Sequence, residues 1–473
     1  MKRRVFLQQT SMAAVGLAIN GYASAGNRAD FPIVRLPEQA RKFKSPAVEK
    51  LISSVQRIGN KEIAWLFNNC FPNTLDTTVD FEIINGKPDT FVITGDIDAM
   101  WLRDSSAQVW PYLPLMKSDK NLQELIKGVI NRQVKCILKD PYANAFYRDE
   151  NKTTEWNKDK TDMKLGVHER KWEIDSLCYP IRLAHGYWKE TGDLAPFDKD
   201  WAEAMRLVVK TFREQQRMEN NGPYRFQRET TNPIDSVPLD GYGYPARKIG
   251  LIHSMFRPSD DATIYPFLIP SNFFAYHSLE QLAEMSKSVL NDMALNVDAG
   301  KLKDSLGEAL VRHAIVRLDN GARIMPYEIN GWGSCNLMDD ANAPGLLSLP
   351  YLISSGQGSL PLYRETRKFV LSDSNPFFFK GKVAEGIGGP HVGMDYIWPM
   401  SIVMRGLTSN DEGEIKNCLG MLQRTHAGTG FMHESFHKDD ASKYTRKWFA
   451  WANTLFGELV WKTFKERPHL LNQ

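Results

Sequence analysis

The stretch Asp104-SSAQVW-Pro111 opens on an acidic residue, runs through mostly apolar positions and reaches a proline. The same plan recurs at Asp175-SLCY-Pro180, Asp261-ATIY-Pro266, Asp340-ANA-Pro344 and Asp395-YIW-Pro399. Each copy has a polar, aromatic-rich approach, and Asp is a residue type that caps the free N–H groups of a helix start. A sixth unit, Trp448-FAWAN-Thr454, carries Asn453 in the acidic position. The sequence therefore predicts an internal repeat of buried helices.

Amphipathic segments separate the repeat units. Apolar residues at i, i+3 and i+4 spacing predict helices over 46–69, 120–140, 181–191, 198–218, 277–295, 301–318, 411–425 and 447–463. Strand signals are few, although 79–85 and 89–95 flank a Gly-Lys-Pro turn and predict a hairpin. The chain repeats the same order of a long loop, a buried inner helix and an amphipathic outer helix. We therefore expect an all-α chain folded as an (α/α)6 toroid, a six-hairpin barrel with a minor β-hairpin.

The acidic residues of the repeat have two interpretations. Capping alone explains any single Asp before a helix. All five, however, are joined to Trp, Tyr, Arg or His, which a cap does not require, so the set favours a shared functional rim. Inner helices that present these loops around one axis would form a deep, acidic, aromatic pocket. Such a pocket suits a neutral polyhydroxylated ligand such as a sugar.

The N-terminal segment has the pattern of an export signal. Residues 1–25 combine a basic start, a weakly apolar middle and the A-x-A site Ala23-Ser24-Ala25, as in a signal peptide. Arg3-Arg4 also resembles a twin-arginine signal, although Lys2 stands where Ser or Thr is usual. We expect an exported, periplasmic protein, with 26–45 as an extended lead-in and 46–473 as one catalytic domain.

Composition excludes several classes of function. The chain has 59 basic and 56 acidic residues, and removal of residues 1–25 takes away Lys2, Arg3 and Arg4 but no acidic residue, so the mature chain is formally neutral at 56 against 56. A neutral chain without a basic block gives no reason to expect nucleic acid, and no later segment has the ~20 apolar residues of a membrane helix. The five cysteines are far apart and odd in number, which predicts buried free thiols rather than disulfides or a metal site.

Cleavage of a glycosidic bond needs one carboxylic acid to protonate the leaving oxygen and a second carboxylate as nucleophile or as base for water. Asp260 and Asp261 are adjacent at one loop tip, where mutual repulsion favours a proton on one of them. Glu434 sits in a Gly-rich turn, for which a solvated loop glutamate is the alternative interpretation. The other acidic candidates are Asp96, Asp98, Asp104, Glu173, Asp175, Asp339, Asp340 and Asp395. Seven tryptophans lie close to the acidic loops, namely Trp101, Trp110, Trp172, Trp332, Trp398, Trp448 and Trp451. They are candidates for sugar stacking, although for Trp110, Trp398 and Trp451 we favour packing at a helix start.

His433 and His437 flank Glu434 in the pattern H-E-S-F-H, which superficially matches the zinc motif H-E-x-x-H. That motif requires a regular helix, whereas Gly428, Gly430 and the polar stretch that follows favour a loop. We therefore expect no metal ion and no cofactor.

Four motifs together resemble glycoside hydrolase family 125, the metal-independent exo-α-1,6-mannosidases. They are Thr94-GDIDAMWLRDSSAQVWPY-Leu113, Lys171-WEIDSLCYP-Ile181, Phe256-RPSDDATIYPFLIPSN-Phe273 and Phe431-MHES-Phe436. The resemblance runs from about residue 46 to 463. It implies an (α/α)6 fold and hydrolysis with inversion, by an acidic residue as general acid and a glutamate as general base.

Transferred residue by residue, the resemblance implies that Glu434 is the base and that the acid is Asp260 or Asp261, of which we favour Asp261. It also implies that the terminal mannose is held by Arg103, Asp104, Glu173 and Asp175. The further substrate-binding candidates are Trp101, Asn272, His433 and Trp448. The expected partner is a mannose-containing oligosaccharide or glycan.

Two other functions stay open at this point. One is an inverting α-glucosidase of the glucoamylase type on the same toroid. The other is a secreted glycan-binding protein that holds a sugar without cleaving it, against which the intact acid and base positions argue.

Overall fold

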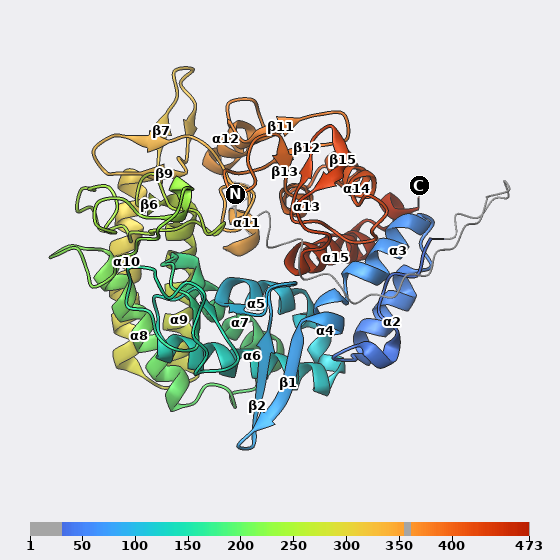
Figure 1. Cartoon of the computed structure of the whole chain (residues 1–473), viewed down its shortest axis with the longest axis horizontal. Coiled ribbons are helices and arrows are strands. Elements are labelled where there is room, and N and C mark those ends of the chain that lie inside the picture. The colour runs from blue at the N-terminus through green and yellow to red at the C-terminus, as the bar shows by residue number, and fades with distance from the viewer. Residues whose placement is uncertain (1–30, 354–360, 473) are drawn as a thin grey trace. The chain divides into compact units, whose positions relative to one another are not determined.

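The computed structural model describes residues 31–353 and 361–472, and the compact unit Val34–Gln473 carries the fold (Figure 1). Helices account for 46% of the chain and strands for 11%, so the expected all-α class is confirmed. The expected signal peptide, residues 1–25, lies outside the described residues. Of the expected lead-in, Arg35 is buried and forms ion pairs with Glu49 and Asp76.

The described residues form six inner and six outer helices, which alternate along the chain. The inner helices are α5 (Leu102–Val109), α7 (Ile174–Thr191), α9 (Ile269–Ser288), α11 (Leu349–Leu352), α13 (Pro399–Leu407) and α15 (Ala450–Glu466). The outer helices are α3 (Lys61–Cys70), α6 (Lys120–Lys139), α8 (Lys199–Gln215), α10 (Met293–His313), α12 (Pro361–Val370) and α14 (Glu412–Thr425). Helix α7 packs against α5 and α9, and α15 packs against α13 and α5. This arrangement is the expected (α/α)6 toroid.

Hydrophobic periodicity distinguishes the two rings. Outer helix α8 buries Trp201, Met205, Val208 and Phe212 on one face, and Asp198 caps its N-terminus by accepting the N–H groups of the first turn. Inner helix α7 is buried almost continuously from Ile174 to Ala184. A helix that is apolar on all sides is stable only where other helices surround it, which places α7 inside the ring.

The first and last parts of the unit meet and close the ring. The predicted helix 46–69 is in fact two helices, α2 (Pro46–Val55) and α3, because the chain turns at Gly59. A Cβ at Gly59 would stand 2.8 Å from the carbonyl oxygen of Asn472, so this close approach requires glycine. The Asn60 N–H donates to the carbonyl of Leu471, at the end of the short helix η5 (Pro468–Leu471), and Figure 1 shows the C-terminus beside α3.

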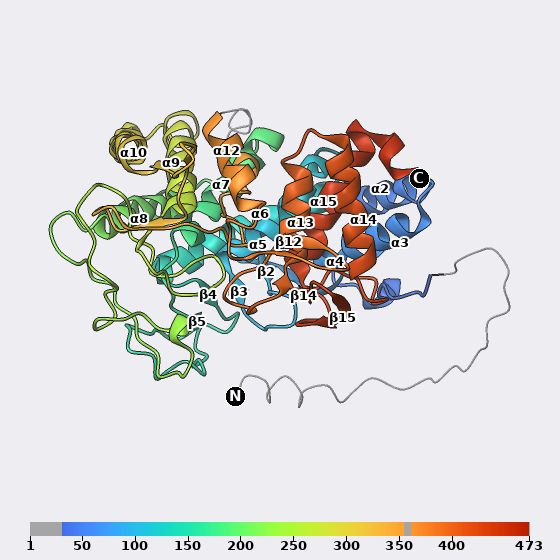
Figure 2. The ribbon, with the colours of Figure 1, turned by 90° about the horizontal axis from the view of Figure 1, so that it is seen from above.

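Short strands lead into the inner helices. Strands β3 (Met100–Trp101), β6 (Phe267–Leu268) and β13 (Tyr396–Ile397) end at or just before the starts of α5, α9 and α13. Each belongs to a three-stranded antiparallel sheet, whose other members are β4 (Ala145–Phe146) and β5 (Val167–Glu169), β9 (Glu328–Ile329) and β10 (Cys335–Asn336), and β14 (Phe436–His437) and β15 (Asp440–Tyr444). Figure 2 shows β3, β4, β5, β14 and β15 on the same side of the helices. These strands therefore surround the N-terminal ends of the inner ring.

The predicted hairpin is present as β1 (Val79–Ile84) and β2 (Lys87–Val92), with Val79 opposite Val92. Two further hairpins, β7 (Val316–Arg317) with β8 (Arg323–Ile324) and β11 (Phe378–Lys380) with β12 (Glu385–Ile387), complete the sheets of the described chain. The remaining short helical segments are η1 (Glu38–Ala40), α4 (Asn73–Thr77), η2 (Trp110–Ser118) and η3 (Pro233–Asp235).

The capping interpretation of the repeated acidic residues is wrong, and the alternative of a shared functional rim was the one that the sequence favoured. Asp104 and Asp175 lie inside the first turns of α5 and α7, whereas Asp261, Asp340 and Asp395 lie in loops. The N-cap positions of the inner helices belong to other residues, and none of them makes a side-chain cap bond. The strands or extended segments that lead into the inner helices place mainly aromatic or apolar residues at the N-cap positions. The carboxylates are therefore free to bind other partners.

All five cysteines are free thiols. Cys70, Cys136, Cys178 and Cys418 are buried, as predicted, but Cys335 in β10 is partly exposed. Among the helices of residues 31–353 and 361–472, none combines the length and the apolar character that crossing a membrane requires.

Candidate active site

One arginine gathers the acidic residues at the N-terminal ends of α5 and α7. The Arg103 Nη1 donates to Glu173 Oε2 at 2.6 Å and to Asp175 Oδ2 at 3.2 Å. Its Nη2 donates to Asp260 Oδ1 at 3.1 Å, and its Nε lies 3.5 Å from Asp104 Oδ2. The prediction placed all five side chains in one pocket, and the structure brings them into one cluster.

The cluster is short of positive charge. Burial raises the pKa of both Asp104 and Asp175 to about 6, although Arg103 lowers them. Burial also raises the pKa of Glu173 well above its usual value, again against the effect of Arg103. One guanidinium thus faces four carboxyl groups, and the site retains protons more readily than exposed carboxylates would.

Asp260 and Asp261 are adjacent in sequence, but their side chains bind different partners. Asp260 adopts a left-handed backbone conformation, with φ 65°, and its Oδ1 accepts from Arg103 and from Asn144 Nδ2 at 3.4 Å. Lys171 Nζ donates to the Asp260 carbonyl at 2.8 Å and fixes the loop. The Asp261 side chain instead meets His391, whose Nδ1 donates to Oδ1 at 2.9 Å.

His391 is a site residue that the sequence prediction missed. It lies in a tight loop between Gly389 and Gly393, which form an isolated β-bridge. Burial acts to lower the pKa of the imidazole, but Asp261, with smaller effects of Glu434 and Asp260, raises it to about 9. Because Glu434 acts on the same ring, the His391 loop brings the two predicted catalytic regions together.

Glu434 lies in a loop that the strands β14 and β15 hold in place. Its Oε2 accepts from Thr445 Oγ1 at 2.8 Å, and its Oε1 accepts from Arg446 Nη1 at 3.4 Å. Arg446 is fixed by Asp96 and by the Thr94 carbonyl. The side chain of Glu434 is 13% exposed, so it is a positioned carboxylate rather than a solvated loop residue.

Residues 433–435 of the H-E-S-F-H segment form a loop, as predicted, but Phe436 and His437 form strand β14. The segment is not helical and cannot form the zinc motif. His433 Nδ1 donates to the carbonyls of Arg446 and Lys447, and its ring stacks on Tyr444 with centroids 3.9 Å apart. In the described part of the chain, no group of three His, Cys, Asp or Glu side chains has an arrangement that could hold a metal ion.

A second layer of charged groups stands behind Asp261. Arg257 is almost fully buried, donates through Nε to Glu328 Oε1 at 2.7 Å, and lies over the Tyr327 ring. Burial raises the pKa of Asp340, and the nearby charge of Asp261 raises it further. Arg257 lies in one of the four motifs, and Tyr327 and Glu328 lie in an irregular stretch, but no pattern in the sequence marked them as site residues.

Many polar atoms of this region have no hydrogen-bond partner among residues 31–353 and 361–472, although they are buried. They include Trp101 Nε1, Glu173 Oε1, Asp175 Oδ1, Arg257 Nη2, Asp261 Oδ2, Tyr327 Oη, Asp340 Oδ2, His433 Nε2 and Arg446 Nε. Buried polar atoms are usually paired, so a cluster of unpaired ones indicates a site whose partners come from a ligand. This mixture of donors and acceptors suits a ligand with hydroxyl groups, because a hydroxyl group can both donate and accept a hydrogen bond.

Other predicted residues have structural surroundings of their own. The Asn272 amide bonds the backbone of Ile252 and Leu268 and holds the loop before α9. Asp339 accepts the N–H groups of Leu346 and Leu347. Trp448 is half-buried near Gly95. The candidates Asp98, Trp332 and Asp395 are surface residues or surface ion-pair members.

The barrel is filled below the carboxylates. One turn below Asp175 on α7, Tyr179 packs edge-on against Phe274 of α9 and Trp451 of α15. In the next turn the Arg182 guanidinium lies over the rings of Trp110, at 3.4 Å, and Tyr351, at 4.9 Å. Two successive layers of side chains therefore close the barrel beneath the site.

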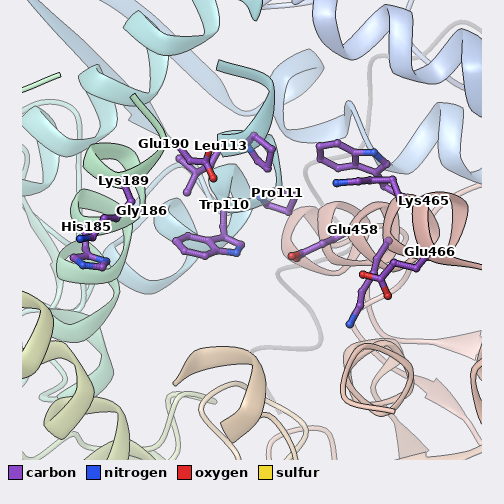
Figure 3. Close-up of a pocket in the computed structure, with 13 residues that line it drawn as sticks. Trp110, Pro111, Leu113, His185, Gly186, Lys189, Glu190, Glu458, Lys465 and Glu466 are labelled. Carbon is purple, nitrogen blue, oxygen red and sulfur yellow. The ribbon is translucent and has the colours of Figure 1, made fainter. Parts of the chain in front are cut away.

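A separate cavity of about 320 Å³ opens at the other end of the barrel. Figure 3 shows Trp110 between His185 and Glu458, which come from the C-terminal half of α7 and from α15. Helix α7 has 18 residues and is therefore ~27 Å long, so this cavity lies far from Glu173 and Asp175 at its start. Trp110, for which packing was the favoured interpretation, belongs to this opposite end.

Comparison with known proteins identifies a family model and a curated protein that match most of this chain. The family model of the metal-independent α-mannosidases, glycoside hydrolase family 125, matches residues 60–461. The meiotically up-regulated gene 157 protein of Schizosaccharomyces pombe is 37% identical over 486 residues, which cover 96% of this chain and 94% of the relative.

Two solved structures extend the comparison. A Streptococcus pneumoniae metal-independent α-mannosidase, in a non-productive complex with α-1,6-mannobiose, is 40% identical and has a TM-score of 0.86, covering 90% of this chain and 100% of its own. A bacterial glucoamylase in complex with acarbose is 11% identical, with a TM-score of 0.51, covering 86% of this chain and 56% of its own. At that identity the second likeness concerns the fold alone.

Proposed function

The chain belongs to glycoside hydrolase family 125, the metal-independent α-mannosidases, and we propose that it is an exo-acting, inverting enzyme that releases single mannose residues from the non-reducing ends of α-1,6-linked mannosides. The observation that carries the proposal is the buried cluster of carboxyl groups around Arg103, with the packed side chains of Tyr179 and Arg182 beneath it. The relative that was solved with α-1,6-mannobiose supports the linkage.

The packed side chains beneath the Arg103 cluster support exo action. The layers of Tyr179 and Arg182 close the barrel directly below the Arg103 cluster. A sugar held at the Arg103 cluster would meet these packed side chains, so we expect the site to accept the end of a glycan rather than an internal residue. The cluster supplies one cation and several acceptors, which match the hydroxyl groups of a terminal pyranose better than those of an internal one.

We assign the general acid to Asp261 and the general base to Glu434. Asp260 is engaged by Arg103 and Asn144, so its carboxylate belongs to the sugar-holding cluster. Asp261 has one oxygen, Oδ2, without a partner among the described residues, and that oxygen is available to a glycosidic oxygen. Glu434 is held by Thr445 and Arg446, which orient it to take a proton from water.

In this reaction the bond between the anomeric carbon and the glycosidic oxygen breaks, and its electron pair stays on that oxygen, which takes the proton of Asp261. A water oxygen bonds to the anomeric carbon and loses its proton to Glu434. One water is consumed, and the mannose leaves with inverted configuration. We further propose export by residues 1–25 to the periplasm, where a mannose-containing glycan would be the substrate.

Parallel digestion of α-1,2-, α-1,3- and α-1,6-mannobiose, with maltose beside them, tests the proposal. We expect release of mannose from the α-1,6-linked disaccharide at the highest rate. Glu434→Gln is the matched inactive control, because it keeps the size of the side chain. Preferred cleavage of maltose would indicate a glucosidase, and binding of mannobiose without any cleavage would indicate a glycan-binding protein.

A further inference from the structure

The site is deepest at Asp175 and opens toward Asp260 and His391. Asp175 binds Arg103 and has a fully buried side chain. Asp261, the assigned acid, is 4% exposed, whereas its two neighbours Asp260 and His391 are 25% and 27% exposed. The acid therefore lies just inside the mouth of the site, and the imidazole of His391 is one of the groups that line this mouth.

The two nitrogens of the His391 ring differ in their surroundings. Nδ1 donates to Asp261 Oδ1 at 2.9 Å, and the Trp398 ring packs beside the imidazole with centroids 6.1 Å apart. Nε2 makes no hydrogen bond to any residue of 31–353 or 361–472. The charges of Glu434 and Asp260 both act on the ring, so the imidazole adjoins the space between the assigned acid and base. One nitrogen thus holds the acid, and the other is free for a ligand.

The chemistry of the reaction places the leaving sugar on this side. A general acid protonates the glycosidic oxygen, which joins the anomeric carbon of the terminal sugar to the leaving sugar. If the Arg103 cluster holds the terminal mannose, the leaving sugar extends past Asp261 and away from that cluster, toward the open mouth. His391 is the side chain that binds Asp261 there.

We propose that His391 is a substrate-binding residue whose Nε2 bonds a hydroxyl group of the leaving sugar, so that the enzyme prefers a saccharide to an apolar group on that side of the scissile bond. This inference rests on the proposed function. A hydroxyl group can both donate and accept, so Nε2 can bind it whether the imidazole is neutral or protonated. The ring would then hold the acid through Nδ1 and the leaving sugar through Nε2.

Two substitutions separate the two nitrogens. The side-chain amide of His391→Asn can donate from near the place of Nδ1, so the bond to Asp261 is kept, but it has no atom at the place of Nε2. The longer side chain of His391→Gln reaches the place of Nε2 and gives up the bond at Nδ1. The first variant should therefore lose the leaving sugar, and the second should lose the support of the acid.

Binding is measured by calorimetry in the Glu434→Gln background, in which bound mannobiose is cleaved slowly. Methyl α-mannoside is the matched ligand, because it has the terminal mannose and the glycosidic oxygen but no leaving sugar. His391→Asn should weaken α-1,6-mannobiose about 3- to 10-fold, the value of one hydrogen bond, and methyl α-mannoside less than about twofold. His391→Gln should keep the mannobiose affinity within about twofold.

His437→Asn is the control substitution, since His437 packs on Tyr396 and should affect neither ligand. Equal weakening of both ligands in His391→Asn would overturn the proposal, because it would place the effect at the terminal mannose or at the acid. An unchanged mannobiose affinity would overturn it as well. So would an equal loss in His391→Gln and His391→Asn, because Nε2 would then not be the group that matters.

A spectroscopic measurement tests the contact without a change at His391. In the Glu434→Gln enzyme labelled with ¹⁵N-histidine, the His391 signals are identified by their loss in either His391 variant. We expect the Nε2 signal to shift on addition of α-1,6-mannobiose and to stay in place with methyl α-mannoside. The same shift with both ligands, or with neither, would refute the contact.

Failure of this inference and failure of the proposed function have different signs. An unsubstituted enzyme that binds mannobiose but does not cleave it would refute the proposed function, and the comparison of the two ligands would still decide the role of His391. Absence of binding of either mannoside would overturn both.

Discussion

Replacement of Arg103 by methionine should make the stability of the enzyme depend strongly on pH. Arg103 is buried and is the cation to which Glu173, Asp175 and Asp260 bind directly. Methionine has a similar length but no charge, so the variant would bury the carboxyl groups without compensation. Removal of one partner from a buried ion pair costs about 3–5 kcal/mol, which is the loss we expect near pH 7.5.

The sign of the pH dependence follows from the raised pKa values. Asp104 and Asp175 titrate at about 6 in the folded enzyme against an ordinary 3.8, so the folded state binds their protons more tightly. At about 1.36 kcal/mol per pH unit, each of these two raised pKa values adds roughly 3 kcal/mol to the free energy of unfolding. The whole contribution is present below pH 3.8, and it is lost as the pH rises to about 6. Without Arg103 both pKa values rise further, and this loss extends to higher pH. The deficit of the variant should therefore be larger at pH 7.5 than at pH 5.

Urea unfolding of the parent and the variant at both pH values, followed by tryptophan fluorescence and circular dichroism, measures the deficit. Leu279→Ala is the control, because Leu279 is fully buried in α9 and carries no charge. It should cost about 2–5 kcal/mol at either pH. An Arg103→Met deficit below about 1 kcal/mol, or one that is equal at the two pH values, would refute the view that Arg103 compensates buried carboxylates.

Three further predictions concern the reaction. Glu434→Gln should lower mannobiose hydrolysis about 10²- to 10⁴-fold without loss of fold, since Thr445 can still donate to the amide oxygen; near-normal turnover would show that another group is the base. Dialysis against EDTA should leave the rate unchanged, as the family description implies, and activity that returned only with Ca²⁺ would contradict it. Proton NMR during the first minutes of α-1,6-mannobiose digestion should show β-mannose first, whereas an initial α-anomer would indicate a retaining mechanism.

The helical architecture could be predicted because its signals are local. One-sided apolar spacing marks outer helices such as α8, and continuous apolar runs mark inner helices such as α7. The strands around the site could not be predicted in this way. Strands of two or three residues, such as β3 and β6, are too short to show the alternation by which strands are recognised.

Site residues could be predicted where the residue and the neighbours that identify it lie in one short motif. Arg103 and Asp104 lie in one such motif, and Glu173 and Asp175 lie in another. His391 was not predictable, because it meets Asp261 across 130 positions of sequence and has no distinctive neighbours except glycines. Propensity alone would have made the repeated acidic residues helix caps, and that interpretation is wrong, since Asp104 and Asp175 pair with Arg103 instead.

The distribution of the cysteines gives this enzyme a built-in site for a spectroscopic reporter. Burial raises the pKa of the Cys136 and Cys418 thiols to about 12, and it raises those of Cys70 and Cys178 as well. Burial raises the pKa of Cys335 too, but its side chain is partly exposed, so we expect a fluorescent maleimide to reach this thiol first. It pairs with Ile329 of β9, next to Glu328, which holds Arg257 behind the acid. A dye at Cys335 would thus report sugar binding in the natural sequence, without an engineered cysteine.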